Sequence, residues 1–527
     1  MDAAEQRTAA KQHGFEQMKT TTLKAVQQFA QATPDAIAIE GDEIHLSYSA
    51  LLSEVESVNR YFQSRGFNCI ALLMDNSPAW VVFDLAAQMA AITLVPLPPF
   101  FTSNQIQHSL ADAGAEVLIS DQTAPLSALL PHARPRPIPK VAGQSCWQVT
   151  LPTASHNRPM LHNIAKVTYT SGTTGTPKGV CLTQTAMDSV ANSLKRAIGI
   201  TAHERHLVLL PLAVLLENVG GIYTPLLAGG RCLIPKLSRA GIMGATELNA
   251  GKMIDAIRHA EANTIILLPQ MLQALTHEMQ RGAPLPEKLR FIAVGGAPVS
   301  QRLLNEATSQ GLPVYEGYGL SECGSVVAVN TPERHRPGSV GKVLPHIAIK
   351  FSDEGEILLA GTLFKGYLNH SPRSDEWYPS GDLGHLDSDG YLYLTGRKKS
   401  CFITSFGRNV APEWVEKELT QHPAINQAVV FGEARPYNIA IIVPHSTDNR
   451  SLKRIEAAIS EANQQLPDYA QVSDWLFADE PFTIANQQLT ATGRARHEQI
   501  WQHYNEHIDQ RYHQHGATAE RSQHAIL

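Results

Sequence analysis

A ten-residue segment rich in glycine and hydroxyl side chains carries the clearest chemical information in this chain. The segment at 170–179 reads Thr-Ser-Gly-Thr-Thr-Gly-Thr-Pro-Lys-Gly and contains five hydroxyl side chains and one lysine, Lys178. Glycine lets backbone N–H groups approach a ligand, and such groups bind phosphate together with hydroxyls and a cation. Pro177 before the lysine and Gly179 after it distinguish the segment from the common P-loop. The segment predicts a polyphosphate-binding loop, with a solvent-exposed turn as the alternative.

Two further clusters combine glycine with groups that suit a flat ligand and a metal ion. The first follows an apolar strand, where open α/β sheets bind ligands, and comprises Gly295, Gly296 and Ala297. In the second, Gly319 follows Tyr318, so that a ring can approach the backbone and stack on the tyrosine. Three residues later, Glu322 offers an oxygen ligand for magnesium. A strand end is the alternative explanation of Tyr318 and Gly319.

A third cluster consists of Ser380, Gly381 and Asp382, with Arg397 fifteen residues after the aspartate. The Asp382 carboxylate can accept hydrogen bonds from two ribose hydroxyls, beside the fixed positive charge of Arg397. A turn residue and a surface charge are the better explanations when Asp382 and Arg397 are taken singly. The joint order of all these clusters favours one shared site.

Length and composition indicate a soluble protein of several structural units. A chain of 527 residues is too long for one hydrophobic core, and its 43% hydrophobic and 17% charged residues are ordinary for a protein with a large interior. The formal charge of -6 gives no support for a nucleic-acid partner. The six cysteines lie far apart and form no Cys-x-x-Cys pair, which disfavours a disulfide framework and a zinc site and fits a reducing compartment.

The sequence predicts neither a signal peptide nor a transmembrane segment, so a cytoplasmic location is expected. Residues 1–19 mix charge and glutamine without an apolar core. The most apolar stretch, 80–101, is interrupted by polar residues and three prolines, so it predicts a buried helix followed by a strand. Near the C-terminus, His503 and His507 are at helical spacing. The composition there predicts a solvated, partly disordered tail, with metal binding as the alternative.

Short apolar strands alternate with amphipathic helices as far as about residue 338. The predicted strands are 69–74, 93–97, 116–120, 207–210, 264–268 and 291–294, and the helices include 51–62, 81–91, 252–260 and 301–309. Continuous apolar strands joined by helices favour parallel sheets covered on both faces. Strands then dominate, at 347–351, 356–360 and 391–395. A charged turn at 396–399 precedes a smaller block with a helix at 414–420 and strands at 428–431 and 439–443.

The order and spacing of the motifs resemble the adenylate-forming superfamily, which includes acyl-CoA synthetases, peptide-synthetase adenylation domains and firefly-type luciferases. The family's phosphate loop matches 170–179, its Tyr-Gly-x-Ser/Thr-Glu signature matches 318–322, and its Ser/Thr-Gly-Asp signature matches 380–382. Gly-Arg at 396–397 and the stretch 406–412 also look like the family. Because the resemblance runs from about residue 22 to residue 500, it covers nearly the whole chain.

The expected fold is α/β. It has a large N-terminal domain of parallel-type sheets flanked by helices plus a small β-barrel-like region, followed by a small mobile C-terminal α+β domain. The expected division is an N-terminal extension at 1–20, a large adenylate-forming domain at 21–398, a C-terminal lid domain at 399–507, and a disordered His-rich tail at 508–527. The resemblance implies that the lid turns about a hinge at Lys399 and Ser400 and places Gly407 beside a tunnel for the thiol.

The resemblance also implies a two-step reaction. A carboxylate attacks the α-phosphate of ATP to give an acyl-adenylate and pyrophosphate, and a thiol then takes the acyl group and releases AMP. The implied cofactors are ATP, Mg²⁺ and either CoA or the phosphopantetheine of a carrier protein. The implied catalytic residues are Lys178, Ser321, Glu322 and Arg494, with Glu322 as the metal ligand. The implied nucleotide-binding residues are Thr170, Ser171, Gly172, Thr173, Thr174, Gly175, Gly295, Gly296, Ala297, Tyr318, Gly319, Asp382 and Arg397.

Three positions depart from the family pattern. Arg494 stands where the family has a lysine in a Thr-x-x-Gly-Lys context, and arginine keeps the charge but is bulkier and forked. We therefore expect a smaller loss of rate than removal of the charge would cause. Val214 stands where many acyl-CoA synthetases have an aromatic residue or histidine, which implies a more open or more apolar pocket entrance. Ser400 stands where the hinge commonly has Asp or Lys.

The expected acid is a medium- or long-chain fatty acid, and the expected acceptor is CoA. The candidate pocket residues are apolar or small, namely Val214, Leu215, Gly220 and Gly221. Amino-acid-activating relatives need an aspartate in the stretch matching 210–217, which has none, and an unpaired ammonium would be costly to bury. Two alternatives stay open: an enzyme that loads a carrier-protein phosphopantetheine, and a nucleotide-binding protein that has lost adenylation.

Overall fold

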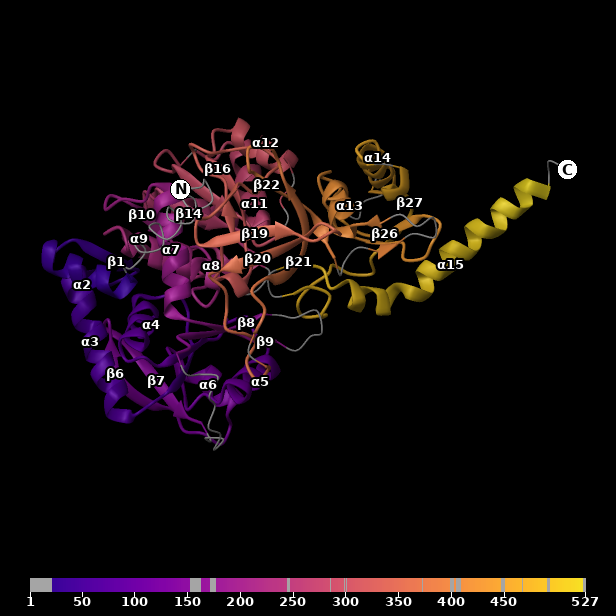
Figure 1. Ribbon diagram of the computed structural model, residues 1–527. Helices are drawn as coiled ribbons and strands as arrows, with labels where there is room; N and C mark the ends of the chain where they lie inside the picture. Colours follow the sequence, from indigo (N-terminus) through magenta and orange to yellow (C-terminus); the bar gives the residue numbers. More distant parts are fainter. Residues whose placement is uncertain are drawn as a thin grey trace, which may run out of the picture.

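The structure is a computed structural model, and it describes residues 21–151, 163–170, 177–243, 247–284, 286–297, 299, 301–371, 373–398, 402–403, 409–446, 451–466, 468–490 and 493–524. Several expected features lie outside these residues: the extension at 1–20, the loop residues from Ser171 to Gly175, the hinge at Lys399 and Ser400, and Gly407. Figure 1 shows a large N-terminal body and a smaller C-terminal part beside it.

One N-terminal sheet has a parallel centre, as predicted. In order it contains β6 (Arg136–Val141), β7 (Gln144–Thr150), β5 (Val117–Ser120), β3 (Cys69–Leu73), β4 (Thr93–Pro96), β8 (Lys166–Thr170) and β9 (Lys178–Leu182). β3 pairs in parallel with β4 and β5, whereas β8 and β9 form an antiparallel pair that brings Thr170 opposite Lys178. The accompanying helices are α3 (Tyr48–Arg65), α4 (Pro78–Met89), α5 (Ser103–Ala113) and α6 (Thr123–Leu129).

The most apolar part of the chain is interior helix and strand. The stretch 80–101 forms most of α4 and all of β4, and α4 is buried on nearly every side from Pro78 to Ala87. A helix that is apolar all round belongs in the core of a large protein. Searched over the described ranges, the chain has no helix whose length and apolar character would let it cross a bilayer.

The second sheet carries the glycine-rich motifs at the ends of its strands. In order it contains β18 (Lys342–Val343), β17 (Ala328–Val329), β16 (Val314–Tyr318), β15 (Phe291–Val294), β14 (Thr264–Leu267), β10 (Arg205–Leu207), β11 (Arg231–Ile234), β1 (Ile37–Gly41) and β2 (His45–Ser47). In this order, every neighbouring pair between β16 and β1 is parallel. Gly295 therefore follows β15 at the same sheet edge where Tyr318 ends β16.

The helices and hairpin that accompany this sheet are α2 (Thr22–Ala32), α7 (Gln184–Ile198), α8 (Leu215–Glu217), α9 (Thr224–Leu226), α10 (Ala250–His259), α11 (Pro269–Gln280), α12 (Gln301–Ser309), β12 (Ile242–Met243) and β13 (Glu247–Leu248). Between α8 and α9 the chain forms a π-helix, η2 (Asn218–Tyr223). A π-helix is rare and is frequently found at functional sites.

One predicted strand is displaced. The apolar run 207–210 is expected to be a strand, but β10 covers Arg205–Leu207 and the chain then leaves the ladder. The reason is a set of side-chain hydrogen bonds: the Leu210 N–H donates to Glu217 Oε2 (2.9 Å), and its carbonyl accepts from Asn76 Nδ2 (2.9 Å). These bonds satisfy the backbone of Leu210 outside the sheet.

A curled antiparallel sheet and a separate C-terminal domain complete the fold. The sheet contains β19 (Ile347–Phe351), β20 (Glu356–Gly361), β21 (Tyr378–Leu386) and β22 (Leu392–Arg397), in the predicted barrel-like region. The C-terminal domain has a core of its own, which draws only on residues after 401. Its elements are β23 (Phe402–Ile403), β24 (Asn409–Val410), α13 (Pro412–Leu419), β25 (Ile425–Phe431), β26 (Asn438–Pro444), α14 (Ser451–Asn463), η4 (Asp468–Ala470), β27 (Val472–Phe477) and α15 (His497–His524).

The last described element is a long helix, and the expected disordered tail at 508–527 stays a prediction. α15 continues as helix past residue 508 and extends away from the body (Figure 1). An apolar stripe at helical spacing packs the first part of α15 on the C-terminal domain, because Ile500, Tyr504, Ile508 and Tyr512 are buried against β25 and β26.

Candidate active site

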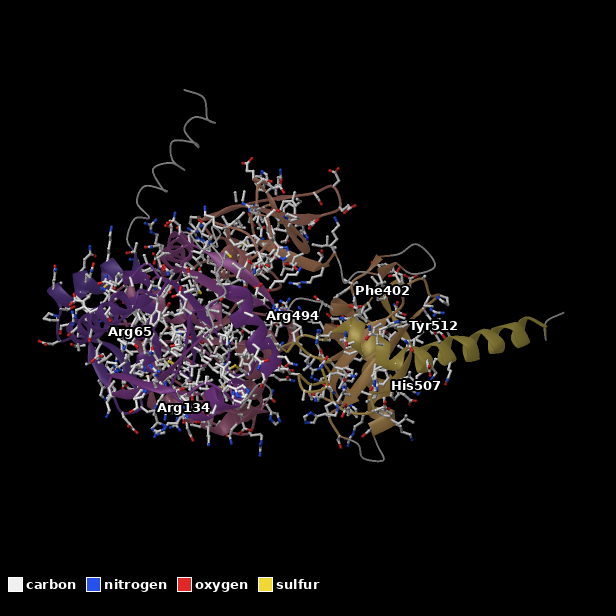
Figure 2. All side chains as sticks on the ribbon, turned by 90° about the horizontal axis from the view of Figure 1, so that it is seen from below. Arg65, Arg134, Phe402, Arg494, His507 and Tyr512 are labelled. Carbon is white, nitrogen blue, oxygen red and sulfur yellow. The ribbon has the colours of Figure 1, made fainter. Side chains whose placement is uncertain are left out.

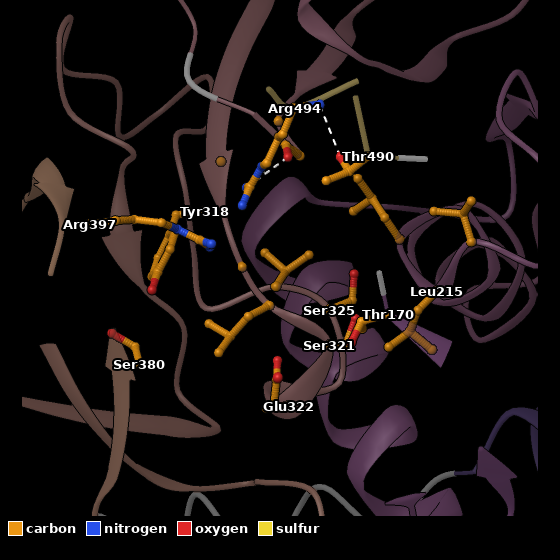
Figure 3. A pocket seen from close by; sticks show the side chains of 18 of the residues that line it. Thr170, Leu215, Tyr318, Ser321, Glu322, Ser325, Ser380, Arg397, Thr490 and Arg494 are labelled. Carbon is orange, nitrogen blue, oxygen red and sulfur yellow. Dashed lines mark hydrogen bonds between the residues drawn. The ribbon is translucent and has the colours of Figure 1, made fainter. Parts of the chain in front are cut away.

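A cavity of about 1400 Å³ lies where the N-terminal body meets the C-terminal domain (Figure 3). Single small-molecule sites are commonly about 300–1,000 Å³. The lining includes residues from both N-terminal sheets, from β21 and β22, and from α15. The cavity therefore has room for two reactants side by side.

Asp382, Tyr318 and Arg397 form a hydrogen-bonded group at one end of this cavity. The antiparallel register of β21 and β22 pairs Asp382 directly with Arg397. The Tyr318 hydroxyl donates to Asp382 Oδ2 (2.6 Å), and the Arg397 Nε–H donates to Asp382 Oδ1 (2.8 Å). Burial and the Asp382 carboxylate raise the pKa of Tyr318 well above its ordinary value, so its hydroxyl remains a donor. Tyr318 and Arg397 line the cavity, whereas Asp382 is buried beside them.

The chain after Tyr318 turns so tightly that only glycine fits. A Cβ on Gly319 would lie 1.7 Å from the carbonyl oxygen of Ser325. Ser325 has a φ of 114°, a strained conformation for a residue with a side chain, and it lines the cavity (Figure 3). Gly295 and Gly296 line the same region. Bare backbone next to the Tyr318 ring leaves space for a flat group.

Glu322 and Lys178 both interact with Tyr367. Glu322 sits in the short 3₁₀ turn η3 (Ser321–Cys323), and its Oε1 accepts from the Tyr367 hydroxyl (2.7 Å). The Lys178 Nζ lies 5.5 Å from the centroid of the Tyr367 ring. Lys178, Ser321 and Glu322 all line the cavity. The cation of Lys178, the hydroxyl of Ser321 and the carboxylate of Glu322 therefore face the same cavity, near the start of β9.

The donor set around Glu322 fits magnesium that arrives with a phosphate ligand. Within the described ranges, the structure has no group of three His, Cys, Asp or Glu side chains that could hold a metal ion. Magnesium usually takes one or two carboxylates and completes its octahedron with water and substrate phosphates. A single carboxylate beside Lys178 meets that pattern and does not fit a permanently bound structural metal.

Arg494 reaches into the cavity from the C-terminal domain, where the two parts of the chain meet (Figure 2). Its Nη2 donates to the Gly296 carbonyl (2.9 Å), while its Nε is buried without a hydrogen-bond partner in the described part of the chain. Burial and the Arg397 guanidinium lower the pKa of Arg494, and Glu413 opposes them. Because a buried donor without a partner is costly, an anion in the cavity would satisfy this one.

One arm of the cavity is apolar. Its walls come from α7, the segment before η2, β14 and η2, and include Leu194, Ile198, Val214, Leu215, Gly220 and Ile266. The lysine and arginine side chains among the described lining residues are Lys178, Arg397, Arg435, Arg494 and Arg496, none of which belongs to these elements. The apolar arm therefore suits an uncharged hydrophobic group.

Gly221 faces the buried, hydrogen-bonded side chains of His206 and Glu217 and is not among the residues that line the cavity. His206 Nε2 lies 2.9 Å from Glu217 Oε1, and both side chains are almost fully buried. A Cβ on Gly221 would lie 2.1 Å from Glu217 Oε1 and 2.5 Å from His206 Nε2. Gly221 thus makes room for the pair, while its neighbour Gly220 forms part of the lining.

A buried ion pair anchors the same π-helix, and sequence reasoning missed both this pair and the His206–Glu217 hydrogen bond. Lys166 Nζ lies 2.9 Å from Asp84 Oδ1 and also donates to Asn218 Oδ1, the first residue of η2. Asn218 Nδ2 in turn donates to Asp84 Oδ2 (3.0 Å). The signal available in the sequence was a lysine at the start of the strand that leads to Thr170, and a charge there is easily taken for a surface residue.

The structure brings most of the described candidate residues to one cavity. Those that line it are Thr170, Lys178, Val214, Leu215, Gly220, Gly295, Gly296, Tyr318, Gly319, Ser321, Glu322, Arg397 and Arg494. Asp382 contacts two of them, and Ala297 adjoins Gly296 in the chain without being part of the lining. Gly221 is not part of the lining and faces Glu217 and His206.

Family models match nearly the whole chain. The model of the AMP-binding enzyme family matches residues 26–368, and that of the AMP-binding enzyme C-terminal domain matches 399–516. The long-chain-fatty-acid–CoA ligase FadD15 of Mycobacterium tuberculosis is 28% identical over 521 residues, covering 82% of this chain and 86% of the relative. The 2-succinylbenzoate–CoA ligase of Bacillus subtilis is 26% identical over 437 residues, covering 79% and 86%.

Solved structures share the fold. The anthranilate CoA ligase AuaEII in complex with anthranoyl-AMP has a TM-score of 0.75 at 20% identity, covering 91% of this chain and 96% of that one. The o-succinylbenzoate CoA synthetase MenE of Bacillus subtilis, in complex with ATP and magnesium ion, has a TM-score of 0.72 at 24% identity, covering 90% and 98%.

Proposed function

The chain belongs to the family of AMP-binding enzymes, as an AMP-forming acid–CoA ligase, and we propose that its acid is a medium- or long-chain fatty acid. The observation that carries the proposal is one cavity in which an apolar arm meets a cationic, glycine-lined end. An acyl chain would occupy the apolar arm, and a nucleotide would occupy the other end.

In the first step, a carboxylate oxygen of the acid forms a bond to the α-phosphorus of ATP, and the bond to the leaving pyrophosphate breaks. A carboxylate carbon is a poor electrophile because oxide would have to leave, and the acyl-adenylate replaces oxide by a phosphate leaving group. Lys178 and Arg494 would offset the negative charge that both reactants bring, and Ser321 would donate to the phosphate. Glu322 would hold a Mg²⁺ ion, which supplies further positive charge to the phosphates.

In the second step, the thiolate of CoA attacks the acyl carbon and AMP leaves. The contact of Arg494 with Gly296 supports a role of Arg494 in the first step, because the arginine lies beside the end of the cavity proposed for the nucleotide. A turn of the domain at 399–507 about Lys399 and Ser400, with Gly407 beside the thiol, stays a prediction for the second step.

A panel of acids in ATP–pyrophosphate exchange tests the proposed substrate. The panel contains straight-chain acids from four to eighteen carbons, an aryl acid and a dicarboxylic acid. We expect kcat/KM to be highest for a medium or long straight chain, because the elements of the apolar arm offer a second carboxylate no lysine or arginine. A preference for the aryl or dicarboxylic acid would refute the fatty-acid assignment, and acyl transfer to holo-carrier protein but not to CoA would select the carrier-loading alternative.

Gly220→Val should shorten the acyl chain that the enzyme accepts. A Cβ on Gly220 would lie 2.9 Å from Ile266 Cδ1, so a branched side chain there narrows the arm between η2 and β14. We expect kcat/KM for a sixteen-carbon acid to fall about 10–200-fold, with little change for a four-carbon acid. Gly251→Ala, in α10 and outside the cavity lining, is the control. An equal loss for both acids would contradict the assignment of this arm.

Arg494→Ala should lower pyrophosphate exchange by about 10–100-fold, the equivalent of one lost charge-assisted hydrogen bond. Arg494→Lys should lower it less, because the positive charge stays. Thioester formation from a chemically prepared acyl-adenylate should be unaffected in both variants. Exchange at the unmodified rate in Arg494→Ala would remove Arg494 from the first step and would favour a protein in which this position is vestigial.

A further inference from the structure

One helix outside the cavity, α5, makes polar contacts with residues on both sides of the segment 171–176. α5 begins in a capping box formed by Thr102 and Gln105, and its residues His108 and Asp112 are four apart and therefore on one face. The Tyr169 hydroxyl donates to Asp112 Oδ2 (2.8 Å), just before that segment. His108 Nε2 lies 3.1 Å from the carbonyl oxygen of Pro177, just after it.

A second series of hydrogen bonds connects α5 with Glu322. Asn369 Nδ2 donates to Asp112 Oδ1 (2.6 Å), and the preceding Leu368 N–H donates to the Gly179 carbonyl (2.7 Å). Farther back along the same segment, Tyr367 donates to the Glu322 carboxylate and the Phe364 N–H donates to the Glu322 carbonyl (2.7 Å). Residues 364–369 thus form hydrogen bonds with α5, with β9 and with η3.

We propose that Asp112 and His108 are positioning residues that fix Lys178 and Thr170 relative to Glu322, and so set the affinity for the triphosphate of ATP. The proposal rests on the proposed function, because it assumes that Lys178 and Glu322 act on the β- and γ-phosphates. Neither residue is part of the cavity lining. Asp112 and His108 instead contact residues next to Thr170 at the end of β8 and next to Lys178 at the start of β9, and these two residues lie opposite each other.

The test compares the binding of MgATP with that of AMP, by calorimetry on the full chain. Asp112→Ala should weaken MgATP binding about three- to tenfold, because it removes the hydrogen bonds of both Tyr169 and Asn369, and should leave AMP binding within twofold. His108→Ala should act in the same direction, and His108→Gln should restore part of the affinity because its amide can donate to the Pro177 carbonyl. Gln107→Ala, on the same helix but bonded to Leu129, is the control and should change neither affinity.

A merely structural role for Asp112 would lower the melting temperature and leave the ratio of the two affinities unchanged, and that result would overturn the proposal. Tyr169→Phe keeps the ring and removes only the hydroxyl, so it answers the same question if Asp112→Ala fails to fold. Failure of the proposed function is distinguishable, because the unmodified protein would then not bind MgATP or would show no acid-dependent exchange.

Discussion

Replacing Glu322 by glutamine is expected to lower ATP–pyrophosphate exchange by about 10²–10³-fold. Glutamine has the shape of glutamate and can still accept from the Tyr367 hydroxyl, so the change removes the negative charge with little other disturbance. Magnesium is a hard cation that prefers an anionic oxygen ligand. We therefore expect the variant to need a higher Mg²⁺ concentration for half-maximal exchange, which a titration of Mg²⁺ at saturating ATP measures.

Two companion variants separate charge from position. Tyr367→Phe removes the hydrogen bond to Glu322 Oε1 and leaves the carboxylate, so its loss of exchange should be much smaller. Glu498→Gln removes a carboxylate that lines the same cavity from α15 and should leave the Mg²⁺ requirement unchanged. An unaltered Mg²⁺ requirement in Glu322→Gln would show that this carboxylate does not bind the ion.

Lys166→Met is expected to lower the free energy of unfolding by about 3–5 kcal/mol. The substitution leaves the carboxylate of Asp84 buried without its cation, in a site where both side chains are almost completely shielded from water. Burial lowers the pKa of Lys166 while the Asp84 carboxylate opposes that shift, so the ammonium depends on its partner. Urea unfolding followed by tryptophan fluorescence and circular dichroism measures the loss.

The double variant Lys166→Met with Asp84→Asn tests whether the pair acts as a unit. It removes both charges, so its loss should be smaller than the sum of the single losses. Arg302→Met, which breaks an exposed ion pair with Glu306 four residues on, is the control and should change stability little. Losses that simply add would mean that Lys166 and Asp84 do not stabilise each other.

Much of the site was predictable because its residues occur in short motifs. Residues 318–322 and 380–382 combine glycine with polar groups at fixed spacing, and the structure places Tyr318 and Glu322 in the lining of one cavity, with Asp382 hydrogen-bonded to Tyr318 behind it. Elements with strong periodicity were also predictable: α12 spans Gln301–Ser309 and β19 spans Ile347–Phe351, as expected. In both cases the information lies within a few neighbouring residues.

Other features were not predictable, because their partners are distant in the sequence. Lys166 meets Asp84 across 82 residues of chain, and Asn369 meets Asp112 across 257. No local pattern distinguishes these side chains from solvated surface residues. Gly220 and Gly221 look equivalent as neighbours, yet the π-helix turns one toward the cavity and the other toward His206.

The amino-acid sequence by itself determined the alternation of helix and strand, the glycine turns and the kinds of groups available for chemistry, since propensity and motif spacing are local properties. Only the tertiary structure decided which of those groups meet, how wide the apolar arm is and which charges are buried in pairs. The reason is physical: burial and long-range contact depend on how sheets and helices pack, and packing brings together residues that the linear order keeps apart.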